Sequence, residues 1–402
     1  MQKIDLPAQA GAKIGGAARG PVPMLDLKRQ HQPLQAELLD ALEQVLKSQQ
    51  FILGEHVAAF ERAAAEQLGV KHALGCSSGT DALWLALAGA GIGPRQSVVT
   101  TPFSFFASVS SILRAGATPV LADIDPVTFN LSPAAVEAVL NGKRGAGVKA
   151  ILPVHLYGLC ADTSAFSKLG RERGLAIVED AAQAWGAEWN GVKAGGLGDA
   201  AAFSFYPTKN LSAAGDAGMV TTDRDDVAER VKMLRNQGMR RRYHHDELGW
   251  NARMDGFQGA VLTVKLKHIG AWNDTRCELA ARYGRLFDRA GLVENGPYPA
   301  NGLVLPHEAL GAKHVWHQYV IRVARRDALR EFLTARGIGS EIYYPVPLHL
   351  QEALKGLGYR EGDFPEAERA AREVLALPIY PELREDEQNT VAEAIAEFLS
   401  EQ

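Results

Sequence analysis

Apolar side chains near the start of the chain recur at steps of three and four residues. Leu34, Leu38 and Val45 follow this spacing, and a second set follows it from Val57 to Leu68. The period places these residues on one face of an α-helix. We therefore predict two amphipathic helices before the first strand.

From residue 72 onward, short runs typical of β-strands alternate with helical patterns. The predicted strands are 97–101, 118–124, 150–154, 175–179, 200–205 and 218–222. Such alternation predicts an α/β fold with a mainly parallel sheet and helices on both faces. One helix start is clear at Ser132 and Pro133, where an N-cap residue precedes a first-turn proline.

The pattern changes beyond about residue 260. Long helical stretches there surround a strand in WHQYVIRVA and a helix in DALREFLTARG, with Asp327 as the predicted N-cap. At 402 residues the chain exceeds the ~250–300 residues at which single cores stop growing. We predict a flexible tail over 1–21, a large domain over 22–260 and a small α+β domain over 261–402.

Composition narrows the partners and the compartment. The formal net charge of −4 gives no general attraction to nucleic acid or anionic membranes. Cys76, Cys160 and Cys277 lie far apart, which is typical of a reducing compartment and offers no metal site. No secretory leader or membrane span is recognisable. We expect a cytoplasmic protein with a small-molecule substrate and without a metal.

Chemical side chains follow four of the predicted strands. Phe105 follows the first, His155 and Tyr157 follow the third, Asp180 the fourth, and Lys209 the fifth, in AFSFYPTKNL. Because ligands of open α/β sheets bind outside the carboxyl ends of the strands, these residues predict one site. Taken alone, Lys209 is also compatible with a surface lysine, and Asp180 with a helix N-cap.

A further element is CSSGTDALWLAL, in which Ser78, Gly79 and Thr80 open a predicted helix. Free backbone N–H groups at such a helix start can bind a phosphate, although the same turn is more often only a cap. A phosphate seat, an aromatic residue, a carboxylate and a lysine together are what pyridoxal phosphate requires.

The sequence from about residue 22 onward resembles the sugar aminotransferases of the DegT/DnrJ/EryC1/StrS family, which are fold type I pyridoxal phosphate enzymes. The stretches that carry the resemblance include FILGEHVAAFE, SSGTDAL, TPFSFFAS, PVHLYG, EDAAQAWGA, FSFYPTKNL, NARMDGFQGAVL and YYPVPLHLQ. AGDAG at 214–218 departs from the usual Gly-Glu-Gly-Gly of the family but keeps an acid among small residues. The resemblance implies a three-layer fold with a mainly parallel central sheet and a smaller α+β domain.

The resemblance also implies roles for individual residues. Lys209 would form the Schiff base, Asp180 would face the pyridine nitrogen, and Gln183 would lie near the ring oxygen. Phe105 would stack on the ring. The phosphate would be held by Ser78, Gly79, Thr80 and Ser204. Asn251 would reach the phosphate of the neighbouring subunit, because the active sites of this family lie at a homodimer interface.

The substrate side is less defined by the sequence. His155 is equally compatible with a buried, hydrogen-bonded histidine and with a substrate contact. Tyr344 and His349 lie on a proline-stiffened loop that the resemblance places beside the sugar pocket. Arg240, Arg241 and Arg242 form either a solvated loop or part of the mouth that accepts a diphosphate.

We therefore expect an aminotransferase that moves an amino group from L-glutamate to a dTDP- or UDP-linked 3- or 4-keto hexose. Pyridoxamine phosphate would carry the amino group between the two half-reactions, in amino-sugar biosynthesis for surface polysaccharide or glycosylated metabolites. The alternatives are a sugar dehydratase of the same fold, in which histidine commonly replaces the lysine, and a non-catalytic regulator. A nicotinamide-dependent enzyme is disfavoured because no complete glycine fingerprint follows a strand.

Overall fold

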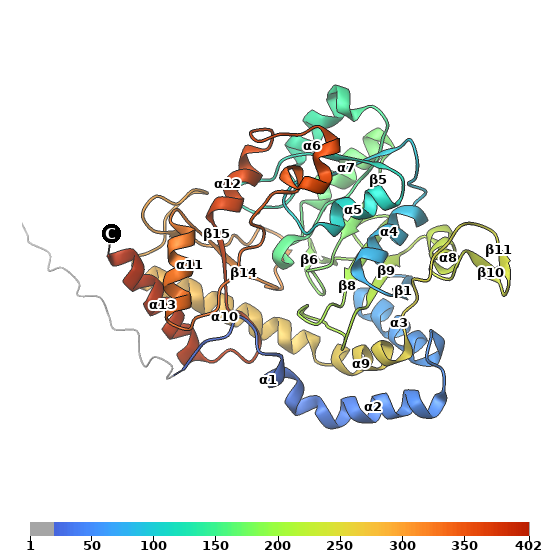
Figure 1. The fold of residues 1–402 in the computed structure, drawn as a ribbon, viewed down its shortest axis with the longest axis horizontal. Coiled ribbons are helices and arrows are strands. Elements are labelled where there is room, and N and C mark those ends of the chain that lie inside the picture. The colour runs from blue at the N-terminus through green and yellow to red at the C-terminus, as the bar shows by residue number, and fades with distance from the viewer. Residues whose placement is uncertain (1–19, 402) are drawn as a thin grey trace, which may run out of the picture.

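The structure is a computed structural model that describes residues 20–401. The predicted tail over 1–21 therefore lies, up to residue 19, outside the described residues. Among residues 20–401, no helix combines the length and apolarity needed to cross a membrane. Figure 1 shows a large part built around one sheet and a C-terminal part, with helix α10 (Ile269–Arg289) running between them.

The central sheet has seven strands in the order β1-β9-β8-β5-β4-β2-β3. Strands β8, β5, β4, β2 and β3 are mutually parallel, whereas β1 and β9 are antiparallel to their neighbours. The bounds are β1 His72–Cys76, β2 Ser97–Thr100, β3 Thr118–Leu121, β4 Val148–Ile151, β5 Ala176–Asp180, β8 Ala200–Ser204 and β9 Gly218–Thr222. All six predicted strands are present, and the prediction of a mainly parallel sheet is confirmed.

Helices cover both faces of this sheet, as predicted. One face carries α4 (Gly79–Gly89), α5 (Ala107–Arg114) and α8 (Asp225–Leu234), and the other carries α6 (Pro133–Asn141) and α7 (Thr163–Arg173). The α6–α7 face packs through an apolar cluster that includes Val99, Ile151 and Phe166. The predicted cap of α6 is confirmed, since the Ser132 hydroxyl accepts a hydrogen bond from Ala135 N at 3.3 Å.

The C-terminal part holds a second sheet in the antiparallel order β12-β14-β15. Its strands are β12 Leu303–Val304, β14 Tyr319–Val323 and β15 Val374–Leu377, covered by α11 (Arg326–Ala335), α12 (Pro365–Glu373) and α13 (Glu385–Ser400). The prediction that Asp327 caps α11 is wrong. The helix begins one residue earlier, so Asp327 lies in its first turn, where its carboxylate pairs with Arg326 Nε at 2.6 Å.

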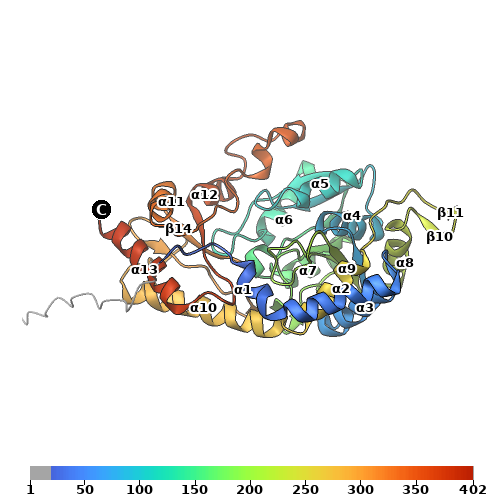
Figure 2. The same cartoon turned by 60° about the horizontal axis from the view of Figure 1, so that its bottom comes forward.

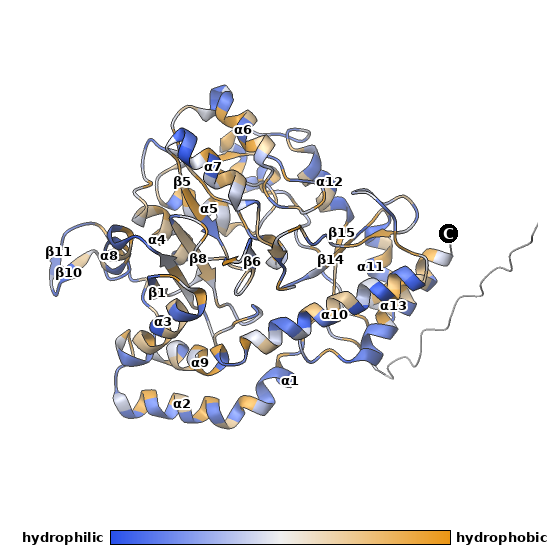
Figure 3. Cartoon of the chain, turned by 180° about the vertical axis from the view of Figure 1, so that it is seen from behind, coloured by the Kyte–Doolittle hydropathy of each residue, from blue (hydrophilic) through white to orange (hydrophobic). Residues whose placement is uncertain are grey.

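The two predicted N-terminal amphipathic helices are α2 (Gln35–Ser48) and α3 (Gly54–Leu68). Figure 2 shows α2 along the outside of the molecule, next to α9 (Gly256–Leu266). Polar and apolar residues alternate along α2, α10 and α13, as Figure 3 shows. The remaining elements are α1 Leu27–His31, β6 Glu188–Trp189, β7 Val192–Lys193, β10 Met239–Arg241, β11 His244–His245 and β13 Ala312–Lys313, with five short 3-10 helices.

The first described residues are fastened to the C-terminal part. Val22 pairs with Ile338 through backbone hydrogen bonds to residues 337 and 339. Helix α1 carries Arg29, whose guanidinium donates two hydrogen bonds, of 2.8 and 2.7 Å, to the buried carboxylate of Glu387 on α13. Residues near the start of the predicted large domain thus pack against the predicted small domain, and the domain bounds stay a prediction.

We predict that Arg29→Met lowers the free energy of unfolding by about 2–3 kcal/mol, because the buried Glu387 carboxylate then keeps only the more exposed Arg384, at 3.1 Å, as a counter-charge. Urea unfolding measures the change. The double variant Arg29→Met/Glu387→Gln serves as control and should lose less than Arg29→Met alone, since it buries no charge. A loss below ~0.5 kcal/mol for the single variant would contradict a stabilising role of the pair.

Candidate active site

Strands β8, β5, β4 and β2 are neighbours in the central sheet and are parallel. Their carboxyl ends therefore lie at one edge, where the chain continues into the segments that carry the predicted site residues. Asp180 is the last residue of β5, and Lys209 follows the end of β8 by five residues. The strand order confirms the prediction that the carboxyl ends of these four strands lie at one edge of the sheet.

Lys209 lies in a turn that its backbone closes through a 2.8 Å hydrogen bond from Lys209 N to Tyr206 O. Burial lowers the pKa of the Lys209 amine to about 8, and the nearby negative charge of Asp180 opposes this shift only in part. A much larger fraction of this amine is consequently neutral near pH 7 than of an exposed lysine, whose pKa is about 10.4. The amine can act as a nucleophile or a base there.

Asp180 is buried, and hydrogen bonds fix its carboxylate. The Ser108 hydroxyl donates to Oδ2 at 2.7 Å, and Ala182 N donates to Oδ1 at 3.2 Å. Burial raises the pKa of this carboxyl, and the two hydrogen bonds and Lys209 oppose that rise. Ser108 was missed by sequence reasoning; the only signal was its position three residues after Phe105, near the start of α5.

The predicted phosphate seat lies beside the same strand end. Ser78 is the N-cap of α4, and its hydroxyl accepts from Asp81 N at 3.1 Å. Gly79 and Gly218 allow neighbouring segments to approach closely because they have no side chain. A Cβ at Gly79 would lie 2.5 Å from Ser204 Cβ, and a Cβ at Gly218 would lie 2.2 Å from Ser78 O. The N-terminus of α4 is thus packed directly against the end of β8. Thr80 follows in the first turn of α4.

Gln183 links the site to the C-terminal part of the chain. Its side-chain oxygen accepts from Tyr157 N at 2.6 Å, and its nitrogen donates to the Tyr344 hydroxyl at 3.1 Å. Phe105 is 59% exposed and lies near Tyr344, with ring centroids 6.4 Å apart. The Tyr344 hydroxyl is thereby held beside Gln183, and the Phe105 side chain stays largely exposed to solvent.

Two predicted substrate residues are engaged inside the protein. His155 is fully buried, its Nε2 lies 2.9 Å from Glu179 Oε2, and its Nδ1 accepts from Ala161 N. Both ring nitrogens are occupied, so the geometry favours the buried alternative for His155. His349 is also buried and bonds Glu368 at 2.8 Å through Nε2, but its Nδ1 has no partner among the described residues.

Asn251 is exposed and accepts two hydrogen bonds from Arg253 at 3.1 and 2.8 Å. No hydrogen bond among residues 20–401 joins it to Lys209, Asp180 or Ser204. The neighbouring arginines, Arg240 and Arg241, lie on the exposed β10–β11 hairpin, where Arg240 pairs with Asp246 at 3.1 Å. Asn251, Arg240 and Arg241 are therefore exposed on the surface of the chain.

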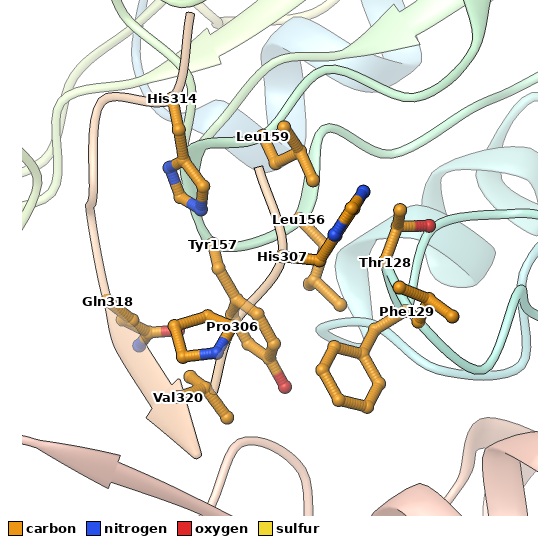
Figure 4. A pocket seen from close by; sticks show the side chains of 11 residues that line it. Thr128, Phe129, Leu156, Tyr157, Leu159, Pro306, His307, His314, Gln318 and Val320 are labelled. Atoms are coloured by element: carbon orange, nitrogen blue, oxygen red, sulfur yellow. The ribbon is translucent and has the colours of Figure 1, made fainter. Parts of the chain in front are cut away.

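A small pocket opens beside Tyr157, between the strand-end segments and the loop before β14. Its lining includes Phe129, His307, His314 and Gln318, and Figure 4 shows these side chains grouped around Tyr157. Of the residues that follow the predicted strands, Tyr157 lines this pocket, whereas Lys209, Asp180 and Phe105 do not.

The donor set fits pyridoxal phosphate. It offers an amine whose pKa is lowered to about 8, a buried carboxylate on the neighbouring strand, and a helix N-terminus packed against the end of β8. These supply a Schiff-base partner, a counter-charge for a pyridinium nitrogen and N–H donors for a phosphate.

The chain is similar to known proteins over most of its length. The family model described as the DegT/DnrJ/EryC1/StrS aminotransferase family matches residues 32–396. A relative from Geobacillus stearothermophilus, named a pleiotropic regulatory protein, is 48% identical over 377 residues, covering 94% of this chain and 98% of its own. A UDP-N-acetyl-3-dehydro-alpha-D-glucosamine 3-aminotransferase from Acidithiobacillus ferrooxidans is 41% identical, covering 94% and 98%.

Among solved structures, the chain is similar to S. venezuelae DesV, whose X-ray structure was determined in complex with a ketimine intermediate. The TM-score is 0.89 and the identity 43%, and the match covers 94% of this chain and 99% of that one. The three-layer arrangement with a mainly parallel central sheet is therefore shared with a solved protein over nearly the whole chain.

We predict that Lys209 of the cofactor-free protein reacts with an amine-acylating reagent with a pH midpoint of about 8, because only the neutral amine is nucleophilic. Mass spectrometry of labelled peptides after short pulses at several pH values measures the midpoint. The exposed lysines provide an internal control, since they should react with a midpoint near ~10.4. A midpoint above 10 for Lys209 would contradict the burial of its amine.

We predict that Gly218→Ala weakens cofactor binding by about tenfold or more, because the added Cβ must displace the backbone at Ser78. Equilibrium dialysis against pyridoxal phosphate measures the affinity. Gly270→Ala is the matched control, since a Cβ there meets no atom within 4 Å. Equal affinities for the two variants would contradict the proposed seat at the N-terminus of α4.

Proposed function

The chain belongs to the DegT/DnrJ/EryC1/StrS aminotransferase family, and from this premise we propose that it transfers an amino group from L-glutamate to a keto-sugar nucleotide. The observation that carries the proposal is the pairing of β5 with β8, which brings the buried Asp180 carboxylate and the Lys209 amine to neighbouring strand ends. The enzyme is pyridoxal phosphate-dependent, as its family is.

Each proposed role rests on the surroundings of the residue in the structure. When bound, pyridoxal phosphate supplies an electron sink for the carbon that loses its proton. Asp180, whose carboxylate accepts hydrogen bonds from Ser108 and Ala182 N, would hold a proton at the ring nitrogen. Lys209 moves a proton at Nζ, for which a pKa of about 8 is suited. Ser78, Gly79, Thr80 and Ser204 bind the phosphate, and Gln183 and Phe105 orient the ring.

We propose that the sugar lies on the side of Tyr344, whose hydroxyl is positioned by Gln183. His349 is retained as a residue of the same loop, whereas His155 is removed from the substrate contacts because both its nitrogens are engaged. The Acidithiobacillus relative is named for amination at carbon 3 of a UDP-linked sugar, which supports a 3-keto substrate. Turnover assays with dTDP- and UDP-linked 3-keto and 4-keto hexoses distinguish these substrates.

We further propose a homodimer with shared active sites, in which Asn251 reaches the phosphate bound to the neighbouring subunit. The exposure of Asn251 and the absence of a described hydrogen bond to its own site support this arrangement. A cytoplasmic location is supported by the three cysteines, which are free thiols. The product would serve amino-sugar biosynthesis for surface polysaccharide or glycosylated metabolites.

A regulatory role is the second candidate, because the Geobacillus relative is named a pleiotropic regulatory protein. The residues needed for transamination are nevertheless all present, since the chain keeps Lys209, Asp180 and the N-cap Ser78. The retained lysine also argues against the dehydratase alternative, in which histidine commonly takes this position. Turnover therefore decides between the candidates.

We predict that mixing the holoenzyme with L-glutamate shifts its absorption from ~420 nm to ~330 nm, because the amino group moves to the cofactor. A keto-sugar nucleotide should then restore the first band and yield the amino sugar, detected by mass spectrometry. Lys209→Ala is the control and should abolish turnover while leaving the fold intact. An unchanged spectrum of the wild-type protein would contradict the proposed function.

A further inference from the structure

Asn210, the residue directly after Lys209, has a buried side chain that is only 4% exposed. Its Nδ2 donates to Asn273 Oδ1 and to Val315 O, both at 2.9 Å, and its Oδ1 lies 3.1 Å from His317 Nδ1. One amide therefore joins the Lys209 turn to α10 and to the loop that precedes β14. The sequence analysis assigned no role to this residue or to His317, although both lie in conspicuous stretches, FSFYPTKNL and WHQYVIRVA.

The orientation of this amide follows from its partners. Val315 O can only accept a hydrogen bond, so the Asn210 atom that faces it is Nδ2. The Asn273 amide is fixed in the same way, because its Nδ2 donates to Trp185 O at 2.9 Å and leaves Oδ1 for Asn210. Asn210 Oδ1 is thus the atom that faces His317.

This orientation determines the protonation of the His317 ring. Because Asn210 Oδ1 can only accept, the hydrogen lies on His317 Nδ1. Burial, with the positive charges of Lys209 and Arg276 and the nearby His314, lowers the pKa of His317 well below its ordinary value. The ring therefore carries one proton, and the Nε2 lone pair accepts no hydrogen bond from the part of the chain that the structure describes.

We propose that Asn210 is a positioning residue that holds His317 as the Nδ1–H tautomer and so keeps an uncharged acceptor, His317 Nε2, on the ring that is hydrogen-bonded to the residue after Lys209. This inference rests on the proposed aminotransferase function. An uncharged acceptor stabilises an ammonium N–H in the site without adding a positive charge that would oppose Lys209. An imidazolium at the same place would repel the amino group that the enzyme must bind.

The first test measures the tautomer without turnover. Long-range ¹H–¹⁵N spectra of the holoenzyme labelled with ¹⁵N-histidine distinguish the two neutral tautomers and the imidazolium, and the spectrum of His317→Phe identifies the His317 signals. We expect a neutral ring with its hydrogen on Nδ1 from pH 6 to 8. A hydrogen on Nε2, or titration within this range, would overturn the proposal whatever the enzyme does with glutamate.

The second test uses Asn210→Asp, which replaces the amide by a carboxylate that favours a doubly protonated His317. The rate of the glutamate half-reaction at pH 7 should fall by about 10- to 100-fold and recover as the pH rises through the new pKa of the ring. Asn141→Asp on the exposed end of α6 is the matched control, expected to stay within about twofold.

The outcomes separate this inference from the function on which it rests. If wild-type protein shows no spectral change with L-glutamate, the proposed function fails, and the NMR result still decides the tautomer. If wild-type protein reacts but Asn210→Asp keeps its rate, its pH profile and the neutral ring, the positioning role of Asn210 is overturned. Should Asn210→Asp not retain cofactor, the wild-type tautomer alone remains decisive.

Discussion

The structure depends on holding two opposite charges, Asp180 and Lys209, out of water at neighbouring strand ends. Burial alone disfavours the charged form of each group, and it shifts the two pKa values in opposite directions. Such a pair persists only where other groups satisfy it. Ser108 and a backbone N–H do this for the carboxylate, whereas burial lowers the pKa of the Lys209 amine to about 8, so that part of it is neutral and nucleophilic near pH 7.

The fold supplies this arrangement through strand order and through close backbone packing. The parallel run β8-β5-β4-β2 gathers four loops at one edge, and antiparallel β9 returns the chain past the N-terminus of α4. Only glycine at position 218 allows that return, because a side chain would enter the backbone at Ser78. The loop carrying Tyr344 then closes over the edge from the C-terminal part, fixed by Gln183.

The sequence predicted the elements with strong patterns and the residues with distinctive chemistry. The six predicted strands were found in the central sheet, but β1, whose sequence is HALGC, was not predicted, because it has neither a β-branched residue nor Phe, Tyr or Trp and contains a glycine. Lys209 and Asp180 stood out as charges after apolar runs. The sequence carried no comparable signal for Ser108, Asn210 and His317. Their contribution depends on hydrogen bonds between segments that are far apart in the sequence. Asp327 was wrongly predicted as the N-cap of α11, because the N-cap is set by the residue at which the backbone becomes helical, and that residue is Arg326.

The contact between Arg29 and Glu387 also sets a limit on when the molecule can be completed. These residues are separated by nearly the whole chain, so during synthesis the N-terminal segment leaves the ribosome long before α13 exists. The central sheet can assemble while the C-terminal part is still being made, but Arg29 stays without its carboxylate partner until α13 has been synthesised. Loss of α13 would therefore weaken the attachment of α1, which would keep the hydrogen bonds of Arg29 to Tyr380 and to Glu382 O.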